Sequence, residues 1–359
     1  MPVFAYTGCF TSESRRGEGT GIGIYRVNAE TGVWRRIGGV DGLTNPSWLL
    51  ANAAGTMLYA LHADMDYVTS FAIDRATGAL TEAGRAKAGG VNGVSAKIDA
   101  SGKWMVVANY ASGHVSVLPI RTNGTLGDAA QSVHLPGEPR PRYRVGHQES
   151  SHPHDVMFDP TGRFVGIPDK GLDKTFMFKF DAKRGRIAPA GKGGFINARA
   201  GSGPRHMAFH PELSVAWVLN ELDSTVTTCR WNGRTGVLSP IEVTLTLPGD
   251  FTGDNQTSEI EYVARSNRLY ISNRGHDSIA MFRPDRKTGR LKLLGWEKSG
   301  GKIPRFFGFD PAGKFFYVAN LRGNNIVRFA VDPRTGALKR SGTACRTNSP
   351  CAIAFVRTT

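Results

Sequence analysis

Short runs that alternate apolar and polar residues recur along the whole chain, separated by tight turns rich in Gly, Pro, Asp and Asn. One example is the turn at residues 99–102, which leads into an apolar run that ends at Asn109. A third run, such as residues 277–282, then precedes a polar turn with a late Gly and a fourth run. Alternation with a period of two, bounded by turn residues, predicts four short antiparallel strands in each copy of the pattern.

The polar turn with the late Gly recurs at Gly32, Gly78, Gly124, Gly185, Gly236, Gly289 and Gly336. Successive glycines are 46, 46, 61, 51, 53 and 47 residues apart. Strand signals that repeat with a period near 50 residues indicate a propeller. The sequence therefore predicts an all-β fold, a seven-bladed β-propeller with four antiparallel strands per blade, in one domain over residues 1–359.

The two ends of the chain each carry part of a repeat. Residues 349–355 read as a first strand with no second strand after it, and residues 3–8 read as a second strand with no first strand before it. Together they complete a seventh blade, so we expect the ring to close by pairing of the N- and C-terminal strands. Closure of this kind leaves no long exposed strand edge.

Composition excludes several classes of protein. The chain has no run of about 18 apolar residues that could span a membrane. Residues 1–4 do not begin a signal peptide, which favours a cytoplasmic protein. The four cysteines form no Cys-x-x-Cys pair, so neither a zinc ribbon nor a disulfide framework is expected, although Cys345 and Cys351 flank the closure region.

The formal net charge of +15 invites a nucleic-acid function. Lys and Arg are, however, spread over all the repeats and form no continuous basic run, so we expect no nucleic-acid partner. A positive field would still attract small anionic metabolites.

The loops on one face of the predicted ring collect the chemically distinctive side chains. These are His152, His154, Arg205, His206, Glu221, Asn273, Arg274, His276 and Arg305, together with Arg142 in a long insertion at residues 134–150. Structural roles are open for several of them: His206 could be a buried, hydrogen-bonded residue, Asn273 a turn cap and His276 a residue that orients a neighbour. Arg205, Glu221 and Arg274 are harder to explain in that way, because charges close to the ring axis need each other or a ligand.

Neither a metal nor a nucleotide cofactor is predicted. The histidines show no paired spacing with carboxylates that would indicate a metal site. The glycines at 17, 19, 21 and 23 resemble a phosphate loop, but they open a strand at residues 22–27 rather than a helix.

Four motifs resemble those of the seven-bladed propeller lactonases: residues 152–156, 203–206, 220–222 and 272–279. This family includes bacterial propeller-type 6-phosphogluconolactonases and fungal carboxymuconate lactonising enzymes. The resemblance implies an active site at the mouth of the central channel, formed by His154, Arg205, Glu221 and Arg274. The chain departs from the family pattern at residues 61–63, where relatives often have an Asn-Glu pair, and at residues 93–95, which lack the usual proline.

The predicted reaction is hydrolysis of an anionic sugar-acid lactone, with 6-phosphogluconolactone as the first candidate. Glu221 or His154 would activate water, and Arg205 would bind the carbonyl oxygen. Arg274 would hold the phosphate or carboxylate of the substrate. The further residues predicted to bind substrate are His152, His206, Asn273, His276, Arg305 and Arg142.

Two other functions remain open from the sequence. The same residues could catalyse lactonisation, as a carboxymuconate-type cycloisomerase does, by protonating a double bond while a carboxylate adds across it. A non-catalytic propeller that binds a protein partner would instead need large apolar groups on the rim. The rim residues are mostly charged or small, which favours an enzyme. The sequence does not indicate an oligomeric state.

Overall fold

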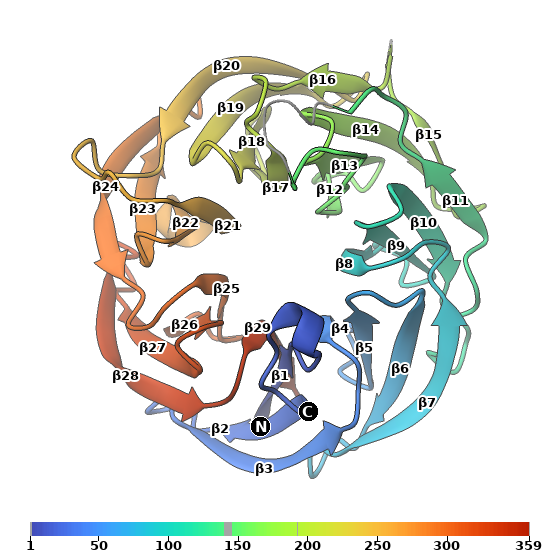
Figure 1. Cartoon of the computed structure of the whole chain (residues 1–359), viewed down its shortest axis with the longest axis vertical. Coiled ribbons are helices and arrows are strands. Elements are labelled where there is room, and N and C mark those ends of the chain that lie inside the picture. The colour runs from blue at the N-terminus through green and yellow to red at the C-terminus, as the bar shows by residue number, and fades with distance from the viewer. Residues whose placement is uncertain (1, 140–145, 192, 359) are drawn as a thin grey trace.

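The computed structural model describes residues 2–139, 146–191 and 193–358, which form seven antiparallel sheets arranged around a central axis (Figure 1). Each sheet is one blade, and its first strand lies next to the axis. The chain is therefore a seven-bladed β-propeller with four antiparallel strands per blade, as predicted. In the described residues, helix is limited to two short 3-10 turns, η1 (Glu13–Arg15) and η2 (Ala264–Ser266).

The strands of each blade are given from the axis outward. The first blade contains β29 (Pro350–Arg357), β1 (Val3–Cys9), β2 (Gly21–Val27) and β3 (Trp34–Asp41); the second contains β4 (Pro46–Ala51), β5 (Met57–His62), β6 (Tyr67–Ile73) and β7 (Leu80–Lys87). The third contains β8 (Gly93–Ile98), β9 (Trp104–Asn109), β10 (His114–Pro119) and β11 (Gln131–His134). The fourth contains β12 (Met157–Phe158), β13 (Phe164–Asp169), β14 (Lys174–Asp181) and β15 (Arg186–Pro189), with β16 (Phe195–Asn197) also paired to β14.

The last three blades follow the same order. The fifth contains β17 (Pro204–Phe209), β18 (Val215–Asn220), β19 (Thr225–Asn232) and β20 (Val237–Leu245). The sixth contains β21 (Gln256–Val263), β22 (Arg268–Arg274), β23 (Ser278–Pro284) and β24 (Leu291–Lys298), and the seventh contains β25 (Pro304–Phe309), β26 (Phe315–Asn320), β27 (Asn325–Val331) and β28 (Leu338–Arg346).

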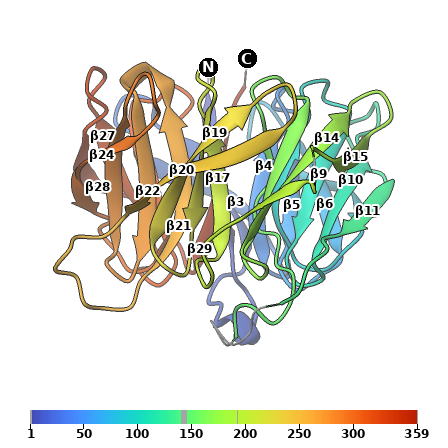
Figure 2. The ribbon, with the colours of Figure 1, turned by 90° about the horizontal axis from the view of Figure 1, so that it is seen from above.

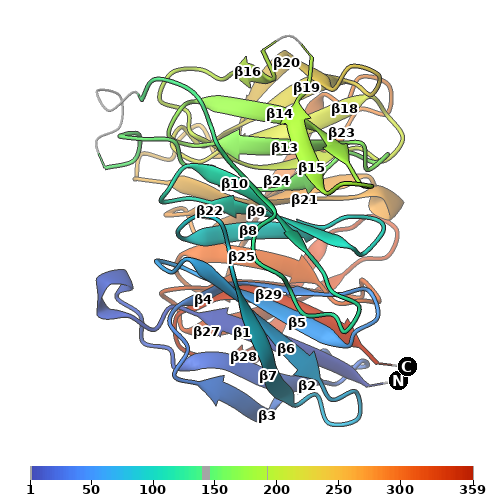
Figure 3. The same ribbon diagram turned by 90° about the vertical axis from the view of Figure 1, so that its right-hand side faces the viewer.

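The ring closes through the two ends of the chain. Strand β29 pairs with β1 in antiparallel register, for example Ala354 with Tyr6. The predicted closure is thus confirmed, and the two termini lie side by side on one face of the ring, opposite η1 (Figures 2 and 3). The glycines from position 17 onward lead into strand β2, as expected, and not into a helix.

Side chains of one blade contact the recurring Gly turn of the neighbouring blade. An aromatic side chain on the second strand of one blade donates a hydrogen bond to a carbonyl oxygen in the Gly turn of the next. These bonds run from Tyr6 to Gly78, Tyr59 to Gly124, Trp104 to Ala182, Trp217 to Gly289, Tyr270 to Gly336 and Tyr317 to Gly32, over 2.6–3.0 Å. In the fourth blade the residue that aligns with the tyrosines is Gly166. Phe164 of that blade aligns with Trp104, and its ring packs so close to Gly236 that a Cβ there would lie 2.5 Å from it.

Removal of one such hydrogen bond is expected to weaken the ring without changing its shape. The hydroxyl of Tyr317 is buried and lies 2.9 Å from the Gly32 oxygen. Tyr317→Phe should therefore lower the free energy of unfolding by about 1 kcal/mol in urea denaturation. Tyr67→Phe, at a half-buried residue that begins β6, is the matched control and should change it by less than about 0.5 kcal/mol. Equal losses in the two variants would contradict the proposed role of these inter-blade bonds.

Candidate active site

The first strands of most blades begin with an irregular residue. The pairing register shifts around Ser47, Val94, Arg205, Arg305 and Cys351, and also across Ser258 and Glu259. A β-bulge leaves one residue unpaired and re-aims its side chain. Here the affected side chains surround the axis, and His154 takes the corresponding place in the fourth blade.

We call this set the bulge ring: Ser47, Val94, His154, Arg205, Glu259, Arg305 and Cys351. Together with Trp48, His206 and Phe306 it lines a space of about 10 Å³ inside the channel. A space of that size holds at most about one water molecule, so the bulge ring constricts the channel.

A second set of side chains comes from one repeated position, just after the polar residue near the end of each second strand. We call it the upper ring: Phe10, Ala63, Tyr110, Lys170, Glu221, Arg274 and Leu321. All but Leu321 line a cavity of about 260 Å³, which is also bounded by Arg15, His147, His154 and Arg305. Leu321 packs against Phe10, Ala63 and Cys351. The cavity therefore has one apolar side. Its other side is strongly charged and is formed by Lys170, Glu221 and Arg274.

Glu221 is the centre of the charged side. Its Oε1 lies 3.3 Å from Nζ of Lys170, and its Oε2 lies 2.8 Å from Nε of Arg205 and 3.3 Å from a terminal nitrogen of Arg274. The side chain is only 4% exposed. Burial by itself raises the pKa of Glu221, but the charges of Lys170, Arg274 and Arg205 outweigh burial and hold this pKa well below its usual range. Glu221 is therefore a carboxylate at neutral pH.

Backbone hydrogen bonds hold these charged residues in place. The Glu221 N–H donates to the Gly203 oxygen over 2.7 Å, and the Lys170 N–H donates to the His152 oxygen over 3.0 Å. The buried carboxylate of Asp169 organises the turn around Lys170, since Oδ1 accepts the backbone N–H groups of His152, Gly171 and Leu172.

His154 faces the same cavity but carries no charge at neutral pH. Burial is the main cause that lowers the pKa of His154 well below its usual value, and the charge of Arg205 adds to the effect. Nδ1 of His154 is buried and has no hydrogen-bond partner among the described residues. The ring lies edge-on to Tyr110, with centroids 5.4 Å apart. His154 thus presents a neutral imidazole beside the ion pairs of Glu221.

Arg205 and His206 lie one layer below the cavity. Arg205 donates to Nε2 of His206 over 2.9 Å, and Nδ1 of His206 donates to Oε1 of Glu259 over 2.8 Å. Burial lowers the pKa of Arg205, as does the like charge of Arg274. A continuous polar chain therefore joins Glu221 to Glu259 through the bulge ring.

The remaining predicted site residues are distributed as follows. His152 lies beside the cavity, where its ring stacks on Tyr110 with centroids 4.3 Å apart and donates to the Tyr110 oxygen. Asn273 is buried and bonded to Thr246, as a turn cap would be. His276 lies against Phe251, with its Nδ1 2.8 Å from the Ser278 hydroxyl. Arg142 falls outside the described residues. The structure thus brings His154, Glu221, Arg274 and Arg305 together at the cavity, and Asn273 and His276 do not line it.

Several residues that line the cavity are absent from the predicted site, and those with the most distinctive chemistry are Tyr110, Lys170 and Arg15. Tyr110 and Lys170 occupy the same repeat position as Glu221, so alignment of the seven repeats could have identified them. Arg15 belongs to η1 in the loop between β1 and β2, and its Nε donates to Asp64 over 2.9 Å. This loop is not part of the repeated pattern, so alignment of the repeats could not have identified Arg15.

The departure from the family pattern at residues 61–63 also has a structural basis. His62 is buried, its Nδ1 donates to the Thr44 oxygen, and its Nε2 lies 2.9 Å from the hydroxyl of Thr69. In the next blade, Asn109 makes the equivalent bond to Ser116, also over 2.9 Å. His62 therefore replaces the usual Asn as a turn cap, and Ala63 leaves the upper ring apolar at this blade.

Among the described residues, no His, Cys, Asp and Glu side chains form a group of three or more that could hold a metal ion. All four cysteines are free. No helix in the described residues has the length and apolar character needed to cross a membrane.

The lactonase motifs imply an active site at the mouth of the propeller channel, and a comparison with known proteins tests the family itself. The family model for "Lactonase, 7-bladed beta-propeller" matches residues 4–355. The chain belongs to this lactonase family.

Similar proteins include two curated enzymes and two solved structures. The 6-phosphogluconolactonase of Bacillus subtilis is 30% identical over 98% of this chain and 97% of its own length. That of Formosa agariphila is 29% identical over 93% of this chain and 94% of its own length. The periplasmic gluconolactonase of Pseudomonas aeruginosa superposes with a TM-score of 0.89 at 25% identity, over 100% of both chains. A putative 6-phosphogluconolactonase of Bacteroides fragilis gives 0.87 at 27% identity, over 99% of this chain and 98% of that one.

Proposed function

We propose that this protein hydrolyses a sugar-acid lactone that carries an anionic group, with 6-phosphogluconolactone as the first candidate. The observation that carries the proposal is the charge of the cavity. Among the described residues it is lined by the cations Arg15, Lys170, Arg274 and Arg305 and by one carboxylate, Glu221. Arg15 is already paired with Asp64, but the other three cations around one carboxylate still leave an excess of positive charge that a phosphorylated lactone would neutralise. The names of the similar proteins support the same substrate class.

We assign the water-activating role to His154 rather than to Glu221. Both oxygens of Glu221 are already engaged by cations, whereas Nδ1 of His154 has no partner among the described residues. The imidazole removes a proton from water as the water oxygen attacks the lactone carbonyl carbon. The bond between that carbon and the ring oxygen then breaks, and the proton passes to the ring oxygen to give the open sugar acid.

The cations in and near the cavity have different roles in the proposed reaction. Lys170 and Arg274, which face the cavity beside Glu221, stabilise the negative charge that develops on the carbonyl oxygen. Arg205 lies one layer lower and acts by positioning Glu221. Arg305 and Arg15, on the apolar side, hold the phosphate. The proposed reaction needs no metal or cofactor, and a phosphorylated sugar lactone as substrate would place the enzyme in the cytoplasm.

The pH profile should identify the base. Because the pKa of His154 lies well below its usual value, the neutral form is complete at about pH 6.5 and above. We therefore expect kcat/KM to stay level between about pH 6.5 and 8 and to fall only in more acidic solution. An unphosphorylated gluconolactone should be used, since a phosphate group titrates near pH 6 itself. An acid limb centred above about pH 7 would contradict the assignment.

Arg305 should determine the preference for a phosphorylated substrate. Its guanidinium group lies over the Phe10 ring, 5.1 Å from the centroid, and borders the cavity. Arg305→Met should lower kcat/KM for 6-phosphogluconolactone by about 10- to 100-fold, the value of a hydrogen bond to a charged group. Hydrolysis of the unphosphorylated lactone should change by less than about 3-fold. Arg290→Met removes an exposed arginine paired with Glu242 and is the matched control for loss of positive charge.

The proposed function is tested by a pH-stat assay of the wild-type protein against a panel of lactones, corrected for spontaneous opening. The panel contains 6-phosphogluconolactone, unphosphorylated sugar lactones and carboxymuconolactone, and the protein is first dialysed against a chelator. We expect acceleration that is greatest for the phosphorylated sugar lactone and is unchanged by the chelator. The proposal would be refuted if the protein accelerated the opening of none of these lactones.

A further inference from the structure

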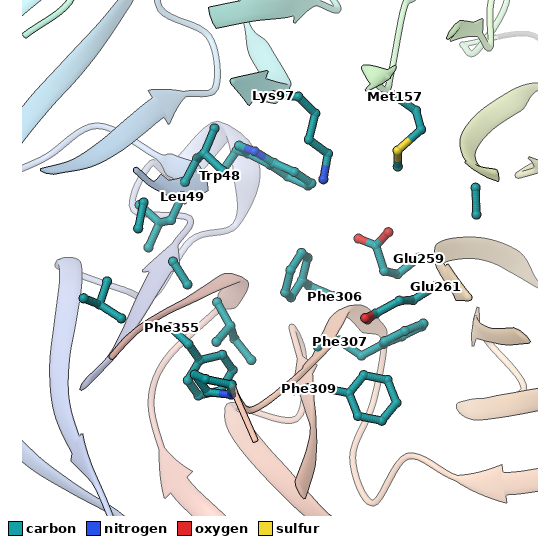
Figure 4. Close-up of a pocket in the computed structure, with 18 of the residues that line it drawn as sticks. Trp48, Leu49, Lys97, Met157, Glu259, Glu261, Phe306, Phe307, Phe309 and Phe355 are labelled. Carbon is teal, nitrogen blue, oxygen red and sulfur yellow. The ribbon is translucent and has the colours of Figure 1, made fainter. Parts of the chain in front are cut away.

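On the far side of the bulge ring the channel widens again into a lower cavity of about 700 Å³ (Figure 4). It is bounded by the first strands of the blades, and it lies toward the face that carries the Gly turns. We define the lower cavity by Trp48, Lys97, Glu259, Glu261, Phe306 and Phe309, all of which line it. Its volume is in the range that binds small organic molecules.

Seven of the residues that line the lower cavity are aromatic. Trp48 and Phe306 meet edge to face with centroids 5.8 Å apart, and both lie close to the bulge ring (Figure 4). Phe309 and Tyr262 line the cavity further along. The faces of such rings attract cations as well as apolar groups.

Two carboxyl groups on strand β21 face this aromatic wall. Glu259 and Glu261 both extend from the strand toward the channel and line the cavity (Figure 4). Glu259 is 8% exposed, and although its Oε1 accepts the hydrogen bond from His206, its Oε2 is buried and has no partner among the described residues. A buried carboxylate oxygen without a partner is costly unless a ligand or ion satisfies it.

Glu261 is a second carboxyl group in the same wall, and a bound cation would favour its ionised form. Burial raises the pKa of Glu261 to about 7, and the neighbouring charge of Glu259 contributes to that rise, while Lys97 opposes it. Lys97 extends into the cavity from β8 (Figure 4). A third carboxylate in the wall, that of Asp155, already accepts bonds from Ser95 and from the Met207 N–H.

We propose that the lower cavity is a second ligand site, which binds a small organic ammonium ion carrying an apolar or aromatic body. The ammonium group lies against Glu259 and Glu261, and the body packs against Trp48, Phe306 and Phe309. The cavity lined by the upper ring therefore prefers anions, whereas the lower cavity prefers cations. The constriction of about 10 Å³ at the bulge ring keeps the two ligands apart. This inference does not depend on the proposed lactonase activity.

The site is tested by isothermal titration calorimetry of the whole protein with 2-phenylethylammonium, and with 2-phenylethanol as the uncharged probe of the same shape. We expect saturable binding of one ammonium ion per chain, at least about 10-fold tighter than binding of the alcohol. Glu261→Gln should weaken binding of the ammonium ion by about 10-fold while lactone hydrolysis stays within about 3-fold of wild type. Lys97→Met removes the opposing cation and should tighten binding by a similar factor.

The two variants keep the test decisive, because the second predicts a gain that no folding defect can produce. Addition of 6-phosphogluconate should leave binding of the ammonium ion unchanged, since the two ligands occupy different cavities. The proposal is overturned if the ammonium ion shows no saturable binding at about 10 mM, or if the alcohol binds equally well. It is overturned as well if Lys97→Met weakens binding, or if 6-phosphogluconate displaces the ammonium ion.

Discussion

Replacement of Glu221 by Gln is expected to reduce kcat for 6-phosphogluconolactone by about 10²- to 10³-fold. The carboxylate is the shared partner of Lys170, Arg205 and Arg274, all three of which lie within 3.3 Å of it. A neutral amide of the same shape leaves these buried cations to repel one another. They no longer hold the positions from which Lys170 and Arg274 face the carbonyl oxygen.

The same substitution should also lower the free energy of unfolding by about 3–5 kcal/mol, the usual cost of removing one partner from a buried ion pair. Inorganic phosphate should inhibit this variant more strongly than wild type, because the cations now lack their internal counter-charge. Glu82→Gln is the matched control: it breaks an exposed pair with Arg85 and should cost at most about 1 kcal/mol without affecting kcat. Full activity of Glu221→Gln would show that the buried ion pairs are only structural.

Replacement of His154 by Ala should have an effect of similar size through a different step. Loss of the proposed general base should lower kcat by about 10²- to 10⁴-fold. KM should stay within about 3-fold of wild type, since the cations that hold the substrate remain. His134→Ala, at an exposed position at the end of β11, is the control and should leave both constants unchanged. A rise in KM with unchanged kcat would mean that His154 only binds substrate. These two variants separate the base from the residue that organises the cations around it.

The fold could be predicted from the sequence because each repeat contains recognisable turn residues. At several late turns the Gly is required because a Cβ would meet an aromatic ring of the preceding blade, as Phe164 shows at 2.5 Å from Gly236. Spacing of those glycines therefore counts the blades. The incomplete repeats at the two ends of the chain likewise predict the pairing of β29 with β1, which the structure confirms.

The site could be predicted only in part, and the reason lies in backbone geometry. Motif resemblance identifies His154, Glu221 and Arg274, but it does not show that Arg205 lies below the cavity. That depth is set by the bulge between Pro204 and His206, which no local residue pattern in the sequence announces. Lys170 follows a buried Asp rather than an Asn, so the repeat position that it shares with Glu221 is easily overlooked.

The position of Arg15 depends on tertiary contacts. The carbonyl oxygen of the Asn45 side chain accepts the backbone N–H groups of Thr11 and Ser12, which fixes the loop that carries η1. These contacts join residues more than thirty positions apart. The lower cavity is hidden for a similar reason, since its aromatic and acidic side chains come from separate blades and meet only when the ring closes.

We propose that Glu221 and His154 together make the cavity lined by the upper ring a lactonase site. The most direct test is a pH-stat measurement of 6-phosphogluconolactone opening by wild type, Glu221→Gln, His154→Ala and the two exposed-residue controls, at equal concentrations of folded protein. We expect rapid opening by wild type and both controls, and a loss of at least about 10²-fold in the two cavity variants. Opening by wild type at the spontaneous rate, or at the wild-type rate by both cavity variants, would contradict it.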